Sequence, residues 1–430
     1  MALRQGLRPL REHRAGTTRK KRRRVVAVVP GFAAKAEDQP VTSYRTAFDR
    51  ALATLRRCAR QADSEARQSG VLLAELLARE PAHRLVMVSN SQRYHRLELC
   101  DLLLERSLRW VQDQPTEART LAELALAIAQ RVDPQRYWQG LIKDAQAKSW
   151  ACLANAHRAL GESPRALEAF RHAGTLLASG SGDPLEEGQL LELKALLLAA
   201  LGQYSMAERL VDRQLASYRQ FDQQGLIARA LAHKAALLLR QGEIGRAIQH
   251  GREALAAIDW KSHRALALEL RRQLLALLDC EGLDLEIGRM LGQSRRLDPR
   301  GSEEWSRLER LRLVARAEAR AGAFGEAEEH LRQAQGRLLS RGDMAEAFRV
   351  LLDLALLFLE SDQPEKLATV RDGAFDLLDS PETDLDVAMV VGGLLQSIRQ
   401  GPFEPAQVAQ LRRQLTLAQC NPERALLLGL

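Results

Sequence analysis

The chain has 430 residues, of which 46% are hydrophobic and only 4% aromatic, and its formal net charge is +8. It contains no uncharged apolar run of about 18 residues, so we expect no membrane-spanning helix. Because Leu and Ala predominate while runs of Val and Ile are scarce, the composition favours helices packed on helices and therefore an all-α fold.

The N-terminal tail, residues 1–40, accounts for the net positive charge of the chain. Residues 1–24 hold eight Arg and two Lys against one Glu, so the remainder of the chain is close to neutral. The tail has no apolar periodicity and is predicted to be disordered. Its densest basic cluster is Arg19, Lys20, Lys21, Arg22, Arg23 and Arg24. Such a cluster would attract nucleic acid or another polyanion, and the alternative is an extension without a function.

A helical cap is predicted next, over residues 41–96. A first helix begins after Thr42 or Ser43, and a second covers about residues 71–80 and ends before Pro81. From about Leu97 to the C-terminus the chain reads as helices with short breaks. Its five widely spaced cysteines fit small buried side chains in a reducing compartment, so we expect a cytoplasmic protein.

Turn residues recur through residues 97–430 at a nearly constant interval. The intervals are 41 and then 40 residues, and the predicted turns are at Gly161, Gly202, Gly242, Gly282, Gly322 and Asp362. Further turns are expected near Asp113 and Gly401. Mostly small residues follow five positions after each turn, namely Ala166, Ala207, Ala247, Ile287, Ala327 and Leu367. This self-similarity predicts a stacked solenoid of helical hairpins.

The stretch WACLANAHRALGESPRALEAFRHA, residues 150–173, has the spacing of a known repeat. Its matching residues are Trp150, Leu153, Gly161, Ala166, Phe170 and Ala173, and it resembles a tetratricopeptide repeat. Ala154 and His157 depart from that pattern, and the period exceeds the usual length of about 34 residues. The better repeats cover residues 147–179, 188–220, 228–260 and 308–340, and weaker ones cover 268–300 and 348–430.

The resemblance implies a right-handed superhelical solenoid of six to seven helix pairs. Degenerate repeats of this kind are common in bacterial regulatory and scaffold proteins. The sequence contains no phosphate-binding Gly loop, HExxH or G-x-S-x-G motif, so we predict no catalytic residue, cofactor or metal. His157 is expected to be a half-buried structural side chain rather than a catalytic base.

The resemblance also implies that the first helix of each repeat lines a concave groove. The groove positions are Lys148, Asn155, Arg158, Leu193, Leu196, Arg229, His233, Arg240, Arg272, Gln273, Arg312, Arg316 and Arg320. We interpret this set as a basic trough with an apolar section at Leu193 and Leu196. A row of Arg on one helix face repels itself unless an anion or an acidic segment covers it. The alternative is a solvated face, offset by Glu309 and Glu318.

These observations predict an adaptor, scaffold or regulatory subunit that binds a peptide or helix of a protein partner. Acidic segments are among the candidate partners, and no membrane binding is expected. One alternative is an accessory protein of a transcription or defence complex that uses the basic tail. A second is a sensor of a peptide or small ligand, and a third is an enzyme without a known motif. The sequence identifies neither the partner nor the oligomeric state.

Overall fold

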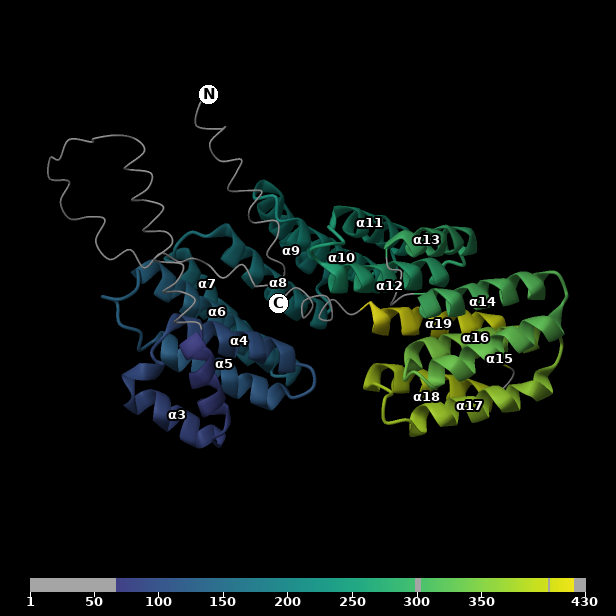
Figure 1. Cartoon of the computed structure of the whole chain (residues 1–430), viewed down its shortest axis with the longest axis horizontal. Coiled ribbons are helices and arrows are strands. Elements are labelled where there is room, and N and C mark those ends of the chain that lie inside the picture. Colours follow the sequence, from purple (N-terminus) through teal and green to yellow (C-terminus); the bar gives the residue numbers. More distant parts are fainter. Residues whose placement is uncertain (1–66, 298–302, 401–402, 421–430) are drawn as a thin grey trace, which may run out of the picture. The chain divides into compact units, whose positions relative to one another are not determined.

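A computed structural model of the chain describes residues 67–297, 303–400 and 403–420 (Figure 1). Within these ranges the regular secondary structure is entirely helical, which confirms the predicted all-α class. The chain divides between Ala230 and Leu231 into two compact units, each described here by itself. The predicted basic tail and the first predicted helix of the cap lie outside the described residues.

In unit 1, the part of the chain up to Ala230, helices pack on their neighbours in chain order. Residues 67–77 are helical and precede the labelled helices. Those are α3 (Pro81–Asn90), η2 (Gln92–Tyr94), α4 (Leu97–Trp110), α5 (Pro115–Ala129), α6 (Gln139–Ala159), α7 (Ser163–Ala178), α8 (Pro184–Ala200), α9 (Tyr204–Gln220) and the first part of α10 (Gln224–Arg240). The predicted break before Pro81 and the helix start at Leu97 are confirmed.

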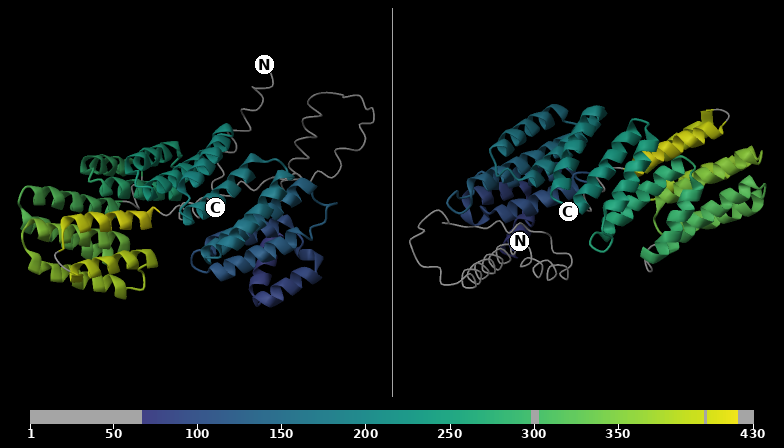
Figure 2. Two further views of the ribbon diagram at one scale, coloured as in Figure 1. Left: turned by 180° about the vertical axis from the view of Figure 1, so that it is seen from behind. Right: turned by 90° about the horizontal axis from the view of Figure 1, so that it is seen from above.

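In unit 2, from Leu231 onward, helices likewise pack on the next helix or the next but one, with one exception. Its further helices are α11 (Ile244–Ala257), α12 (Arg264–Cys280), α13 (Asp284–Leu297), α14 (Glu303–Arg320), α15 (Phe324–Leu339), α16 (Met344–Glu360), η3 (Pro364–Lys366), α17 (Leu367–Asp379), α18 (Leu385–Gln400) and α19 (Pro405–Gln419). The exception is α19, which packs on α18 but also on α12 and α16 (Figure 2).

The predicted turns have the backbone conformation that their residue types favour. Each of the six positions has a positive φ, from 54° at Asp362 to 83° at Gly322. At Gly242 the amide of Glu243 donates to Leu238 O at 2.9 Å, and that of Gly242 to Leu239 O at 3.0 Å. This pair of bonds is a Schellman motif, in which a left-handed residue satisfies the last carbonyls of the helix. Asp222 and Gly342 form similar turns between pairs.

The residues predicted to pack five positions after each turn are buried. Ala166, Ala207, Ala247 and Ala327 have no exposed surface, and Ile287 exposes 2%. Small side chains at these places allow the second helix of a pair to lie close to the first. The extra residues of the 40-residue period are accommodated by helices of 17 residues such as α8 and α9.

His157 is a half-buried residue, as predicted, and its Nδ1 lies 2.6 Å from Glu162 Oε2 across the turn. This hydrogen bond lowers the pKa of Glu162. Cys100, Cys152 and Cys420 are buried, as expected, whereas Cys280 is only partly buried. None of the described helices is both long and apolar enough to cross a bilayer.

Candidate partner-binding surfaces

The predicted groove residues divide by exposure into two sets. Seven are buried in the structure: Asn155, Leu193, Leu196, Arg229, His233, Gln273 and Arg312. Six retain solvent contact: Lys148, Arg158, Arg240, Arg272, Arg316 and Arg320. The open basic trough with an apolar section therefore needs correction, because about half of its side chains are covered by the chain's own helices.

In unit 1 the first helix α6 packs on the first helices of the neighbouring pairs, α4 and α8. Lys148 Nζ on α6 donates to Asp101 Oδ1 on α4 at 2.9 Å. Burial alone would lower the pKa of Lys148, but Asp101 and Glu186 outweigh it and raise that pKa. Asn155 Oδ1 accepts a bond of 2.9 Å from Arg158 Nε, while Asn155 Nδ2 has no hydrogen-bond partner.

The apolar section predicted at Leu193 and Leu196 is part of the helix packing. Each exposes 5% of its surface, so neither lines an open groove. Nearby, Arg229 Nη2 donates to Glu192 Oε2 at 2.7 Å in a buried ion pair between α10 and α8. Burial raises the pKa of Glu192 because Arg229 only partly offsets it.

In unit 2 the predicted row on α14 is covered by carboxylates of the same chain. Arg312 Nε donates to Asp353 Oδ2 on α16 at 2.8 Å, and its Nη1 donates to Glu309 Oε1 at 3.0 Å. Arg316 Nη1 donates to Asp284 Oδ1 at 2.8 Å. Its Nη2 bonds both Asp279 and Asp353. The expectation that the row awaits an external anion is thus corrected, because the acidic cover is internal.

These contacts belong to a larger group, which we name the buried charge cluster. Its carboxylates are Asp279, Glu309, Glu346 and Asp353, and its guanidinium groups are Arg312, Arg316, Arg349 and Arg412. They come from α12, α14, α16 and α19, so the cluster joins helices that are distant in sequence. Four negative and four positive groups balance, which is the condition for burying charge at tolerable cost.

Burial and neighbouring charges shift the pKa values of the cluster in opposite directions. Burial would raise the pKa of Asp279, but the surrounding arginines led by Arg316 hold it well below its usual value. Glu309 differs from Asp279. Its burial outweighs the attraction of Arg312 and raises the pKa of Glu309 to about 7. Burial lowers the pKa of Arg412, and Asp353 only partly opposes this.

The helix α19 closes one side of the cluster and was not predicted as part of any site. Arg412 donates to Asp353, and Gln419 accepts from Arg349. Gln419 Nε2 donates to Glu346 Oε1 at 3.1 Å. On the side of α12, Thr416 Oγ1 lies 3.4 Å from Ala276 O. We call the space between α12 and α16 that holds this helix the α19 channel.

One signal for this cluster was present in the sequence. Asp353 lies 41 residues after Arg312, about one period later, so acidic and basic residues alternate on successive first helices. The ion pair between Asp353 and Arg412 has no such signal, because it forms only where α19 packs back on α12 and α16.

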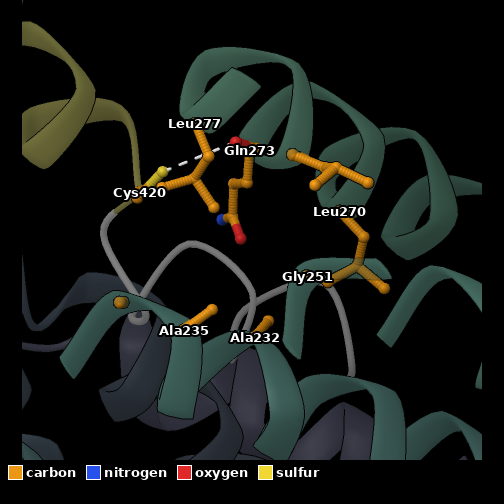
Figure 3. A pocket seen from close by; sticks show the side chains of 9 residues that line it. Ala232, Ala235, Gly251, Leu270, Gln273, Leu277 and Cys420 are labelled. Atoms are coloured by element: carbon orange, nitrogen blue, oxygen red, sulfur yellow. Dashed lines mark hydrogen bonds between the residues drawn. The ribbon is translucent and has the colours of Figure 1, made fainter. Parts of the chain in front are cut away.

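The chemistry available is that of fixed ion pairs. Every carboxylate of the cluster has a guanidinium partner, so none is a free general base or nucleophile. A small cavity beside the end of α19 has a volume of about 10 Å³, roughly one water molecule (Figure 3). Its lining includes Gln273 and Cys420, whose Sγ donates to Gln273 O at 3.7 Å. No group of side chains suited to holding a metal occurs in the described ranges.

Comparison with known proteins gives no relative for this chain: it matches no family model, and it matches no curated protein.

Proposed function

We propose that the chain is a non-enzymatic protein-interaction module, an adaptor, scaffold or regulatory subunit that binds a helix or peptide of a partner. The observation that carries the proposal is the α19 channel. Side chains of α16 and a backbone carbonyl of α12 already hold a helix there by a defined set of polar contacts.

The architecture supports the same conclusion. Consecutive helical packing, the 40-residue spacing of the turns and the buried small residues favour a solenoid of helical hairpins similar to tetratricopeptide repeats, with a right-handed superhelical course. Solenoids present long surfaces rather than enclosed pockets, and such surfaces suit polypeptide partners.

The exposed basic residues supply a further argument. Arg272 retains 40% of its side-chain surface, and its Nη2 lies 3.8 Å from Asp343 Oδ1, a long ion-pair distance. A guanidinium in this state can pair with an acidic group of a partner at low desolvation cost. Lys148 and Arg158 in unit 1 are further basic candidates beside α4 and α8, and both also bond within the chain, to Asp101 and Asn155.

Affinity capture of the tagged full chain, with nuclease treatment, tests the proposal. We expect a defined protein partner that survives nuclease and is lost with Arg272→Glu. The matched control is Arg289→Glu, an exposed Arg of α13, which should retain the partner. Capture of nucleic acid alone would contradict the proposal, and so would equal loss with both variants.

A further inference from the structure

The last helix occupies a place that the order of the other helices does not explain. Other helices pack on the next helix or the next but one, whereas α19 packs on the more distant α12 and α16 as well as on α18. Its polar contacts reach residues 59 to 147 positions earlier in the chain. It therefore lies against the rest of unit 2 in the way a separate ligand helix would.

The channel is internally paired without α19. Asp353 keeps both Arg312 and Arg316 as partners, and Glu346 keeps Arg349 at 3.6 Å. Removing α19 would thus leave no carboxylate of the channel unpaired. The cluster would then hold four carboxylates against three guanidinium groups, a difference of one charge.

The helix carries one cation that the channel satisfies only in part. Arg412 has Asp353 as its ion partner, and its Nε has no hydrogen-bond partner. Burial outweighs the attraction of Asp353 and lowers the pKa of Arg412, so the cation is better solvated in water than in the channel. In addition to its polar contacts, α19 packs into the apolar core of unit 2 through Val408, Leu411 and Leu415.

We propose that α19 is an exchangeable internal ligand, and that the α19 channel receives a partner helix presenting the same face. That face has an Arg, a small hydroxyl residue four positions later and an amide side chain seven positions after the Arg, as in Arg412, Thr416 and Gln419. Aliphatic residues flank it. The inference deepens the proposed function and rests on it, because it names the partner class and makes α19 the competitor.

A labelled peptide of residues 403–420, with Cys420→Ser, is the probe, and its binding to the full chain is measured by fluorescence anisotropy. Thr416 exposes 2% and faces the backbone of α12, so Thr416→Lys in the chain should undock its own α19. Gln414 is exposed on the same helix, and Gln414→Lys is the matched control.

An internal ligand lowers the apparent affinity of the channel for an added peptide, which is the intrinsic affinity multiplied by the fraction of molecules whose channel is open. We expect the peptide to bind the Thr416→Lys chain about tenfold or more tightly than the wild-type or Gln414→Lys chain. A peptide carrying Thr416→Lys should lose this binding, whereas one carrying Gln414→Lys should keep it. Because the peptide variants leave the chain itself unchanged, they test the inference even if the Thr416→Lys chain is unstable.

Several results would overturn the inference. One is equal binding of the peptide to all three chains, and another is no binding to a Thr416→Lys chain that melts cooperatively. If Thr416→Lys prevents folding, amide exchange in α19 of the wild-type chain is measured with excess wild-type peptide. Exchange that the peptide does not accelerate would also overturn the inference. If light scattering shows a dimer of the wild-type chain that is lost with Thr416→Lys, the partner in the channel would instead be a second copy of this chain. A captured partner that is insensitive to Thr416→Lys would leave the proposed function standing and remove only the channel.

Discussion

At the scale of single residues, the most consequential finding is where the arginines of α14 point. Arg312 exposes 1% of its surface and is surrounded by carboxylates from three helices. Its charge is therefore used within the chain, and it orients helices rather than meeting a partner. Arg320, at the end of the same row, remains exposed beside Asp284.

The charge balance of the cluster predicts a large penalty for removing one carboxylate. Asp353 contacts Arg312, Arg316 and Arg412, so Asp353→Asn leaves three buried cations under-compensated. We expect a loss of about 3–5 kcal/mol in the free energy of unfolding, measured by urea denaturation. Asp372→Asn, at an exposed pair with Arg371, should cost less than about 1 kcal/mol. Similar losses for both variants would contradict the role of the cluster.

Glu309 predicts a pH dependence of stability with a defined sign. Burial raises its pKa from 4.5 to about 7, so the folded chain binds a proton that the unfolded chain releases. Stability from this group is complete below about pH 4.5 and is lost as the pH rises through 7. Asp279 and Asp353 have lowered pKa values, and their effect falls below that window.

Urea midpoints measured from pH 4.5 to pH 8 check this expectation. The wild-type chain should lose up to about 3 kcal/mol over the window, and Glu309→Gln should flatten the profile. A profile that rises with pH in the wild-type chain, or that Glu309→Gln leaves unchanged, would contradict the assigned pKa of Glu309.

At the scale of elements, the turns could be predicted from the sequence and the return of α19 could not. A left-handed residue after a helix strongly favours Gly or Asp, so Gly242 and Asp362 mark their turns locally. The small residues after each turn are local signals too. The ion pairs that join different helices of the cluster depend on contacts across 33 to 70 positions, and only the pair one period apart left a trace in the sequence.

The apolar pattern also misled at one place for a physical reason. Leu193 and Leu196 lie on α8 at positions that line the groove in the family that the repeats resemble. Here they are buried, since α8 is apolar around most of its circumference and packs on both α6 and α9. A helix of that kind gives no sequence signal for which of its faces is covered.

Gly242 provides a clean test of the turn assignment. Its φ is 82°, and a Cβ there would meet no atom within 4 Å, so Gly242→Ala incurs backbone strain alone. We expect it to destabilise unit 2 by about 1–2 kcal/mol. Gly245→Ala, at an open helical position three residues later, should stabilise by about 0.5–1 kcal/mol. Thermal melts of both variants decide the matter, and a change of the same sign would refute the turn.

At the scale of the whole molecule, the two compact units offer different surfaces. Unit 1 presents half-buried basic residues beside α4, α6 and α8, while unit 2 holds its own last helix in the α19 channel. If binding requires that helix to leave, affinity is set by competition as well as by contact, and any event that loosens α19 would raise it.

The central claim is that α19 opens while the rest of unit 2 stays folded, and amide hydrogen exchange of the unmodified full chain tests it most directly. We predict that the amides of Leu411 to Gln419 exchange about tenfold or more faster than the buried amides of α12 and α16. Exchange of α19 in one cooperative step with α12 and α16 would contradict the claim, because the helix would then be an integral part of the fold.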